Sequence, residues 1–258
     1  MRDLLLAPIY FIYKLWIGFV FWVTLMILYL PFRILLSKEK WYGKAFQLKR
    51  FWSGLIQKSI FCPVKVQVLS SLPKGAFVIA SNHSSHLDTV FLYRIMPRYF
   101  AFVGKGELLK WPLFRLFFRT SDIPVDRENS VRAYQSLMKA NAVLAEGKCI
   151  AIYPEGTIPD SSPRMKSFKK GAFRVAIENN VPIVPITWQS NYKIMNNPEK
   201  LFSPSLPSVV RVVVHPPVYP TGREDQDLVA LRNEVFRIID SALPEEHRKN
   251  DIKQTNEL

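Results

Sequence analysis

The sequence predicts an α/β fold with a mixed, largely parallel sheet and flanking helices, preceded by N-terminal membrane-associated helices. From about residue 62, short apolar runs alternate with helical stretches, a pattern typical of chains that wind around a parallel sheet. Before residue 60, residues 15–32 form an uncharged apolar run of 18 residues, the lower limit for a bilayer span. We therefore expect membrane-anchoring helices over residues 1–60 and a folded α/β domain over residues 61–258.

The N-terminal segment carries further features of a membrane anchor. Its apolar region is too long for a secretory signal peptide, and no small-residue cleavage site follows it. Residues 38–58 hold six Lys or Arg against one Glu, together with Trp41 and Trp52. Aromatic rings and cations suit the headgroup layer of a bilayer. Because these cations adjoin the α/β domain, the positive-inside rule predicts that this domain lies on the cytoplasmic side of the membrane.

The charge of the chain predicts an anionic partner. The net charge is +14 and the isoelectric point is about 9.8. Nucleic acid, an anionic membrane surface and acidic substrates all fit that charge. Because the cations and aromatic rings lie beside a span-length apolar segment, we expect an anionic bilayer surface and no nucleic acid. Two cysteines, Cys62 and Cys149, exclude a disulfide framework and a cysteine-built zinc site. Cys149 is predicted to be a small core residue.

The elements follow in order along the α/β domain. The apolar runs predict six strands: Val64–Leu69, Ala76–Ser81, Tyr99–Val103, Cys149–Tyr153, Val181–Thr187 and Val209–Val214. Helices are expected to begin near Ser85, Glu107, Asn129, Lys169 and Glu224. The helix from Asn129 has a suitable N-cap and ends at Gly147, which suits the position after a C-cap. Polar residues beyond the carboxyl ends of parallel strands tend to line a site. The turns at residues 81–88, 104–107 and 154–157 should therefore converge.

The first of these turns admits two interpretations. Ser85 and Asp88 have the spacing of a capping box, which explains them as an ordinary helix start. His83 and Asp88 would point about 140° apart on one helix, since five residues turn it by roughly 500°. They meet only if His83 lies before the helix and folds back over its first turn. Asp88 would then hold one ring nitrogen and leave the other free as a base.

The other two turns also hold candidate site residues. Glu155, Gly156 and Thr157 form either a tight turn or a ligand-binding one, because glycine lets backbone approach a ligand closely. Lys105 and Arg127 suit anion binding, although most Lys and Arg are solvated surface charges. Residues 164–174 add five cations without an acid, which is either an anion-binding patch or a solvated helix start.

Together these motifs resemble the glycerophospholipid acyltransferase family, typified by 1-acylglycerol-3-phosphate acyltransferase. The motifs match in the order of the family over roughly residues 76–188, and the N-terminal apolar helices fit the same family. The matching stretches are Asn82-His83-Ser84-Ser85-His86-Leu87-Asp88, Lys105 with Ile123-Pro124-Val125-Asp126-Arg127, Tyr153-Pro154-Glu155-Gly156-Thr157 with Phe168-Lys169-Lys170-Gly171, and Val181-Pro182-Ile183-Val184-Pro185-Ile186. His86 is not part of the pattern, and we interpret it as local polar packing.

The resemblance implies a membrane-bound O-acyltransferase. His83, oriented by Asp88, would be the catalytic base, and backbone amides near Gly156 would stabilise the oxyanion. Acyl-CoA or acyl carrier protein would be the donor, and lysophosphatidate (1-acylglycerol 3-phosphate) would be the lysophospholipid acceptor. The implied substrate-binding residues are Lys105, Arg127, Glu155, Gly156, Thr157 and Lys169. No metal or cofactor is expected, because the His and carboxylate set lacks a third convergent ligand.

One departure from the family pattern concerns the acceptor. The third motif usually reads P-E-G-T-R, and this chain has Ile158 where that arginine stands. Arg164, Lys166 or Lys169 would have to replace it as a phosphate contact. Alternatively, the acceptor has no phosphomonoester at that place, as in a lyso-aminoacyl lipid with a free hydroxyl. A further alternative for the whole protein is a non-catalytic membrane lipid-binding protein.

Overall fold

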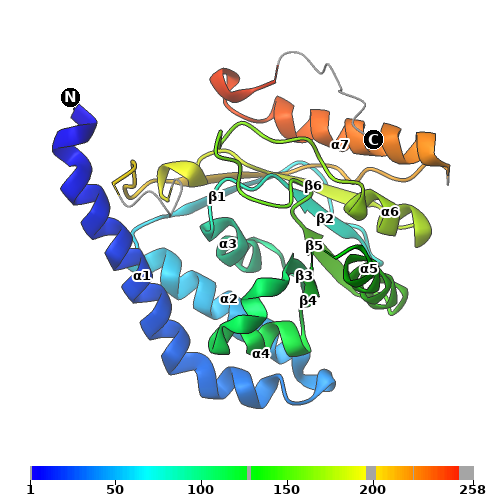
Figure 1. Ribbon diagram of the computed structural model, residues 1–258, viewed down its shortest axis with the longest axis horizontal. Coiled ribbons are helices and arrows are strands. Elements are labelled where there is room, and N and C mark those ends of the chain that lie inside the picture. Colours follow the sequence, from blue (N-terminus) through cyan, green and yellow to red (C-terminus); the bar gives the residue numbers. More distant parts are fainter. Residues whose placement is uncertain (1, 127–128, 196–201, 223, 250–258) are drawn as a thin grey trace.

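The computed structural model describes residues 2–126, 129–195, 202–222 and 224–249, and it contains one seven-stranded sheet (Figure 1). The spatial order of the strands is β1-β7-β6-β2-β5-β3-β4. Neighbouring strands are parallel except β6 and β7, which pair antiparallel. The predicted mixed, largely parallel sheet is therefore confirmed. The strands are β1 (Val64–Val68), β2 (Val78–Ser81), β3 (Phe100–Lys105), β4 (Ile123–Val125), β5 (Cys149–Ile152), β6 (Ile183–Trp188) and β7 (Val210–Val214).

The six predicted strands are present, and their ends lie within two residues of those expected. The sequence pattern missed β4, a three-residue edge strand whose Ile123 pairs with Val103 of β3. Pro124 lies in its middle. Because proline cannot donate a ladder hydrogen bond, it occurs within sheets mainly in edge strands. Its presence in so short a run makes the segment difficult to predict as a strand.

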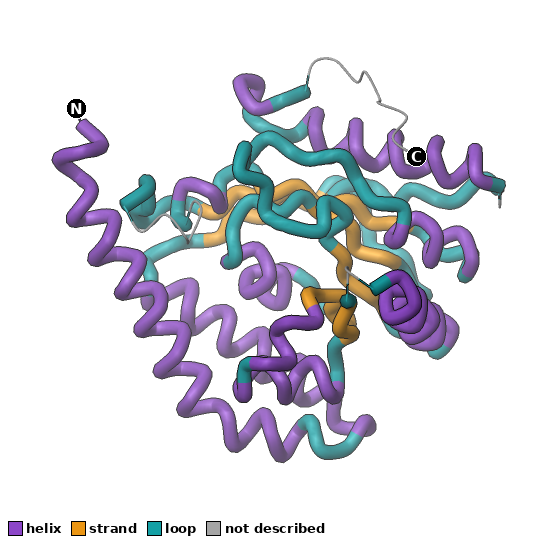
Figure 2. Tube along the Cα trace, in the orientation of Figure 1, coloured by secondary structure: helices purple, strands orange, loops and turns teal. Residues whose placement is uncertain are grey.

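Helices cover both faces of the sheet (Figures 1 and 2). One buried cluster joins the sheet to α1, α2, α3 and α4, and another joins its opposite face to α5, α6 and α7. Asn129 caps α5 by accepting the amide of Arg132, and Gly147 follows this helix with a φ of 77°, as its sequence position predicts. The α-helices are α1 (Arg2–Leu35), α2 (Tyr42–Ser59), α3 (Leu87–Ile95), α4 (Pro112–Thr120), α5 (Ser130–Ala145), α6 (Gly171–Glu178) and α7 (Asp225–Ser241).

The helix expected near Glu107 begins later than predicted. Residues Gly106–Lys110 form a 3₁₀ turn, η2, and the α-helix starts at Pro112. Proline at the first helical position has a suitable φ and lacks only an amide that would be unpaired there, which explains this start.

The two N-terminal helices share the hydrophobic core of the α/β domain. Phe32 of α1 and Phe46 of α2 are buried in the same cluster as β2 and α3. The Tyr13 hydroxyl donates to the carbonyl of Ile60, and the Trp52 indole donates to Thr24. Trp52 was expected in the headgroup layer with its neighbours. It is buried instead, because α1 and α2 pack their inner faces against the sheet.

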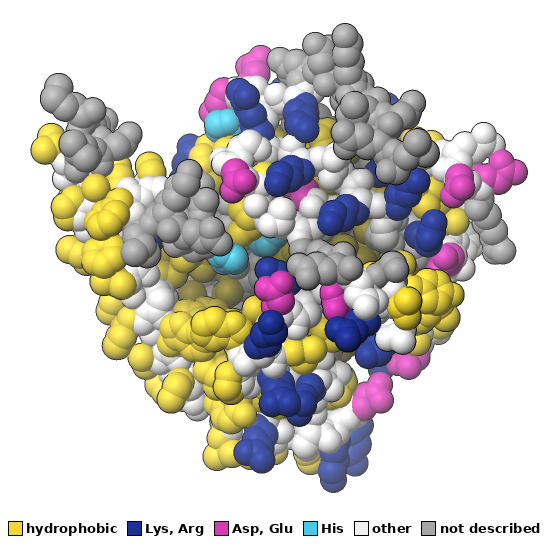
Figure 3. Space-filling model, in the orientation of Figure 1, with side chains coloured by type: hydrophobic (Ala, Val, Ile, Leu, Met, Phe, Trp, Pro, Cys, Tyr) yellow, Lys and Arg dark blue, Asp and Glu magenta, His cyan; other side chains and the backbone are white. Residues whose placement is uncertain are grey.

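The outer face of α1 is apolar and exposed. Among the described residues, one helix is long and apolar enough to cross a bilayer, and it is the segment Leu5–Leu35 of α1. Exposed side chains recur at helical spacing along it: Leu5, Ile9, Ile12, Trp16, Phe19, Val23, Met26, Leu30 and Ile34. Figure 3 shows these hydrophobic side chains gathered along one edge of the molecule.

Candidate active site

The three polar turns meet at one edge of the sheet. They follow β2, β5 and β3, which are neighbours, and their parallel arrangement brings the carboxyl ends together. A cavity of about 420 Å³ opens there, with His83, Lys105 and Thr157 among its lining residues. Several aromatic side chains also line it, including Phe102 and Phe114. The predicted convergence is therefore present in the structure.

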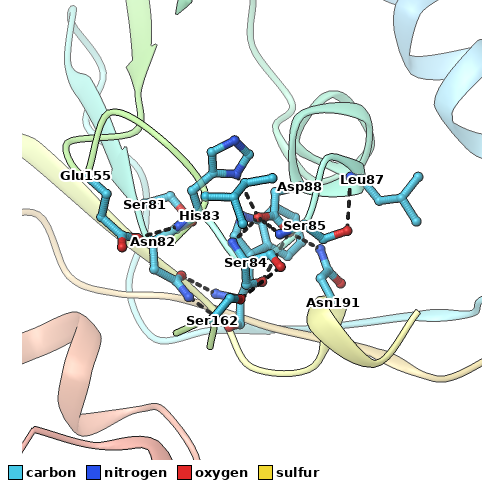
Figure 4. A network of polar contacts seen from close by, with 12 residues as sticks. Ser81, Asn82, His83, Ser84, Ser85, Leu87, Asp88, Glu155, Ser162 and Asn191 are labelled. Atoms are coloured by element: carbon cyan, nitrogen blue, oxygen red, sulfur yellow. Dashed lines mark hydrogen bonds and ion pairs between the residues drawn. The ribbon is translucent and has the colours of Figure 1, made fainter. Parts of the chain in front are cut away.

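His83 and Asp88 form a hydrogen-bonded pair in this cavity (Figure 4). His83 Nδ1 lies 3.0 Å from Asp88 Oδ2, and the Asp88 side chain is completely buried while that of His83 is 14% exposed. His83 belongs to the turn before α3 and folds back over the first turn of the helix, as the sequence requires for the pair to meet. The other ring nitrogen, Nε2, remains available for a substrate proton.

The helix-start interpretation is also correct in part. Asp88 Oδ2 accepts the backbone amides of Ser84 at 2.6 Å and Ser85 at 2.9 Å. The Ser85 hydroxyl accepts the amide of Leu87 at 3.3 Å. One carboxylate therefore orders the start of α3 and contacts the imidazole. These two amides and His83 Nδ1 all contact the same carboxylate oxygen, which fixes the orientation of the carboxylate toward the imidazole.

Tyr153 supports the imidazole from one side. Its ring stacks on that of His83 with centroids 4.1 Å apart and planes 12° apart. This stacking restricts rotation of the imidazole and so keeps its Nδ1 directed at Asp88. From the sequence, Tyr153 is expected at the end of a strand and at the first position of the third motif, without a role of its own. Its position immediately before Pro154 was the available signal.

Asn191 supports Asp88 from the other side. It is fully buried in the 3₁₀ turn after β6, and its side-chain amide donates to Asp88 Oδ1 at 2.7 Å. Asn82 holds the end of β6, shortly before this turn, because its side chain exchanges two hydrogen bonds with the backbone of Trp188. Asn191 is not among the residues that the sequence predicts for the site. A contact across 103 residues leaves no local pattern.

We expect Asn191→Leu to lower kcat about tenfold and the free energy of unfolding by about 1.5–3 kcal/mol. It removes a hydrogen bond to a buried charge, which is worth more than one between neutral groups. Steady-state kinetics and urea unfolding measure the two effects. Tyr192→Phe is the matched control, because it removes a hydrogen bond to His247 from the same turn without touching Asp88. Equal activity losses in the two variants would show that Asn191 has no special relation to the pair.

Glu155 lies behind the pair with its carboxylate turned toward backbone. It is 3% exposed, and its two oxygens accept the amides of His83 at 2.7 Å and Lys166 at 2.8 Å. Burial raises the pKa of Glu155 to about 8, while these two amides act in the opposite direction. The predicted substrate-binding residue thus holds the turn of His83 to the loop of Lys166 in this conformation.

Gly156 is required by the shape of its turn. Its φ is +77°, and a Cβ there would lie 3.1 Å from Cε of Lys169. Its amide donates to the carbonyl of Tyr153 at 3.0 Å, so that amide is already used within the turn. Lys169, exposed at the surface, is the predicted replacement cation that lies against this turn. Thr157 and Ile158 line the cavity beside it.

The remaining predicted residues lie at the margin of the site or outside the described residues. Lys105 lines the cavity, but its side chain is 55% exposed and pairs with Glu107 at 2.7 Å. Arg127 lies outside the described residues. His86 was expected to be packed locally. It is exposed and lines the cavity, with its ring centroid 6.4 Å from that of His83. In the described part of the chain, no group of three or more His, Cys, Asp or Glu could hold a metal ion.

Comparison with known proteins identifies relatives of this chain. A family model described as Acyltransferase matches residues 63–189. A probable 1-acyl-sn-glycerol-3-phosphate acyltransferase of Mycoplasma pneumoniae is 27% identical over 68% of this chain and 70% of the relative. A 1-acyl-sn-glycerol-3-phosphate acyltransferase of Chlamydomonas reinhardtii is 33% identical over 67% of this chain, which spans half the length of that relative. The crystal structure of the 1-acyl-sn-glycerophosphate acyltransferase PlsC from Thermotoga maritima matches with a TM-score of 0.65 at 24% identity, over 92% of this chain and 93% of that one.

The fold and the matching motifs define an α/β acyltransferase. The family model spans β1 to β6 and contains both His83 and Asp88. The chain belongs to the glycerophospholipid acyltransferase family and is an enzyme of that type.

Proposed function

We propose that this chain is a membrane-bound enzyme that transfers a fatty acyl group from acyl-CoA or acyl carrier protein to the free hydroxyl of 1-acylglycerol 3-phosphate. The hydrogen bond between Asp88 and His83, which lines a cavity that contains several aromatic side chains, carries this proposal. The names of the relatives support the lysophosphatidate acceptor. We assign catalysis to residues 61–258 and membrane anchoring to residues 1–60.

In the proposed mechanism His83 is the general base. Its Nε2 removes the proton of the acceptor hydroxyl while that oxygen attacks the thioester carbonyl carbon. Asp88 holds Nδ1 and stabilises the imidazolium, and Tyr153 stacks beneath it. The C–S bond then breaks, and the leaving thiolate takes the proton from Nε2. No acyl-enzyme is required, because the acceptor supplies the nucleophile. We place the oxyanion near the amide of Thr157, since the amide of Gly156 is used within the turn.

The aromatic part of the cavity suits an acyl chain. Phe21 and Trp52 from the N-terminal helices line it together with Phe102, Phe114 and Phe117. Lys49 and Asp122, a buried ion pair, also line it. Apolar walls near the dyad would bury hydrocarbon while the thioester lies at His83.

We propose that α1 lies within one leaflet and holds the domain on the cytoplasmic surface. Its inner face contributes buried residues from Tyr10 to Phe32, while its outer face is apolar and exposed. A helix that packs against the domain along its length would carry α2 into the hydrocarbon if it crossed the bilayer. An in-plane position exposes only its outer face to lipid.

The test of the proposed function is an acyl-transfer assay with purified protein. Labelled acyl-CoA and acyl carrier protein are offered with lysophosphatidate and with other monoacylated lipids, including a lyso-aminoacyl lipid. We expect phosphatidate as the principal product. The second acceptor class is included because Ile158 replaces the usual arginine of the motif. Lipid binding without transfer to any acceptor would instead identify a non-catalytic lipid-binding protein.

We expect Arg127→Ala to raise KM for lysophosphatidate about tenfold or more with little change in kcat. Arg127, with Lys105 and Lys169, is proposed to bind the acceptor phosphate, and tenfold corresponds to about 1.4 kcal/mol of uniform binding. Initial rates against acceptor concentration measure it. Arg232→Ala, on α7, is the control for loss of an arginine elsewhere. An unchanged KM, together with no inhibition by glycerol 3-phosphate, would favour an acceptor without this phosphate.

A further inference from the structure

Helix α4 has one face in the core and another in solvent. Phe117 and Phe118 are buried, whereas Arg115 and Arg119 are exposed. Two further exposed residues, Lys110 and Trp111, immediately precede the helix, and Trp111 is 56% exposed. We call Lys110, Trp111, Arg115 and Arg119 the α4 surface. It combines three cations with a large aromatic ring, and residues 110–120 contain no acid.

The α4 surface continues the exposed apolar face of α1. Trp111 stacks on Trp22 of α1 with centroids 6.1 Å apart and planes 26° apart. Trp22 is itself 37% exposed, and its ring also meets Phe114 of α4 edge to face at 5.9 Å. Trp22 therefore links the apolar face of α1 to Trp111, which lies next to the cations. In Figure 3 a hydrophobic surface borders dark blue cations in this part of the molecule.

The same segment forms part of the cavity wall. Leu108 of η2, with Phe114 and Phe118 of α4, lines the cavity that contains His83. The α4 surface is therefore the outer side of a helix whose inner side lines this cavity. A lipid acceptor that stays in its leaflet needs the cavity to open at the depth of the headgroups.

We propose that the α4 surface is a second membrane-contacting surface that binds anionic lipid headgroups and sets the cavity entrance at the membrane interface. Tryptophan is favoured at this depth, and cations are attracted to anionic lipid. Contact through the apolar face of α1 limits rotation about the helix axis, and a second contact beside it restrains that rotation further and fixes the orientation of the domain. This inference rests on the membrane association proposed above.

A site-specific fluorescent probe tests the contact. Both natural cysteines are buried, so Arg115→Cys allows an environment-sensitive dye to be attached on the α4 surface. Lys139→Cys, exposed on α5 across the sheet, is the matched control. With vesicles of phosphatidylcholine and phosphatidylglycerol, we expect a blue shift at position 115 and quenching by a headgroup-proximal spin-labelled lipid. Position 139 should show neither. If the protein sediments with vesicles and both positions behave alike, the inference is wrong; if it does not sediment, the proposed membrane association has failed.

Charge reversal tests the effect on the reaction. We expect Arg115→Glu/Arg119→Glu to raise KM about tenfold for an acceptor presented in anionic vesicles and to leave kinetics with a monomeric short-chain acceptor unchanged. Lys139→Glu/Arg237→Glu makes the same charge change on the opposite face and should leave both values unchanged. Equal losses in the two double variants would overturn the inference. A loss seen only with acyl carrier protein as donor would also overturn it, because the surface would then bind that acidic protein.

Discussion

Replacing His83 by alanine is expected to lower kcat for acyl transfer by about 10³-fold while leaving folding and membrane association intact. The variant loses the base that takes the acceptor proton, a contribution that typically ranges from about 10² to 10⁴. His83 is partly exposed, and its ring contacts Asp88, Tyr153 and His86, so its loss leaves most of the buried core unchanged. Single-turnover rates with labelled donor measure the effect. His247→Ala, a histidine outside the cavity, is the control.

Asp88 requires a substitution that keeps a hydrogen-bond acceptor at this position. Asp88→Ala would leave the amides of Ser84 and Ser85 without their acceptor inside the protein, which costs about 1–3 kcal/mol for each buried group left unpaired. Asp88→Asn keeps an acceptor for these amides but cannot hold an imidazolium. We expect it to fold and to lose activity as severely as His83→Ala. Near-normal turnover in His83→Ala would contradict the mechanism, whereas unfolding of both His83→Ala and Asp88→Asn would leave only the helix-start role.

Replacing Lys49 by methionine is expected to lower the free energy of unfolding by about 3–5 kcal/mol. Lys49 Nζ lies 3.1 Å from Asp122 Oδ2 and 3.1 Å from the Ser121 hydroxyl, and both charged side chains are nearly completely buried. Burial lowers the pKa of Lys49, and Asp122 opposes that shift. Removing one partner leaves an uncompensated buried charge, the most costly way to break such a pair. Urea unfolding measures the change.

The double variant Lys49→Met/Asp122→Asn separates loss of the pair from loss of packing. Asp122 Oδ1 accepts the amide of Phe102 at 3.2 Å, and the side-chain oxygen of the introduced asparagine can accept the same amide. No buried charge would remain at the pair. We expect the double variant to recover most of the lost stability, since neutral replacements of buried ion pairs are often tolerated. A double variant as unstable as Lys49→Met would show that the lysine acts through packing against Tyr93 and Phe117.

The strands and helices that have a clear hydrophobic pattern or capping residue of their own were predicted from the sequence. Alternating apolar runs indicated six of the strands, and capping residues such as Asn129 marked where helices begin. The sequence pattern does not predict strand β4, because Pro124 interrupts a three-residue run. It predicts a helix start near Glu107, where the structure has the 3₁₀ turn η2 before α4. In each case the neighbouring strand or helix stabilises a segment whose own pattern is weak.

The sequence by itself determined the fold class and, through its motifs, the family. The spacing of His83 and Asp88 allowed either a pair or an ordinary helix start, and the family resemblance implied the pair. Only the tertiary structure decided which distant groups surround that pair. Asn191 contacts Asp88 across 103 positions, Glu155 holds the His83 backbone across 72, and Lys49 meets Asp122 across 73. The order of strands in the sheet sets these contacts. Periodicity records which face of an element is buried, but it carries no information about which element will cover that face.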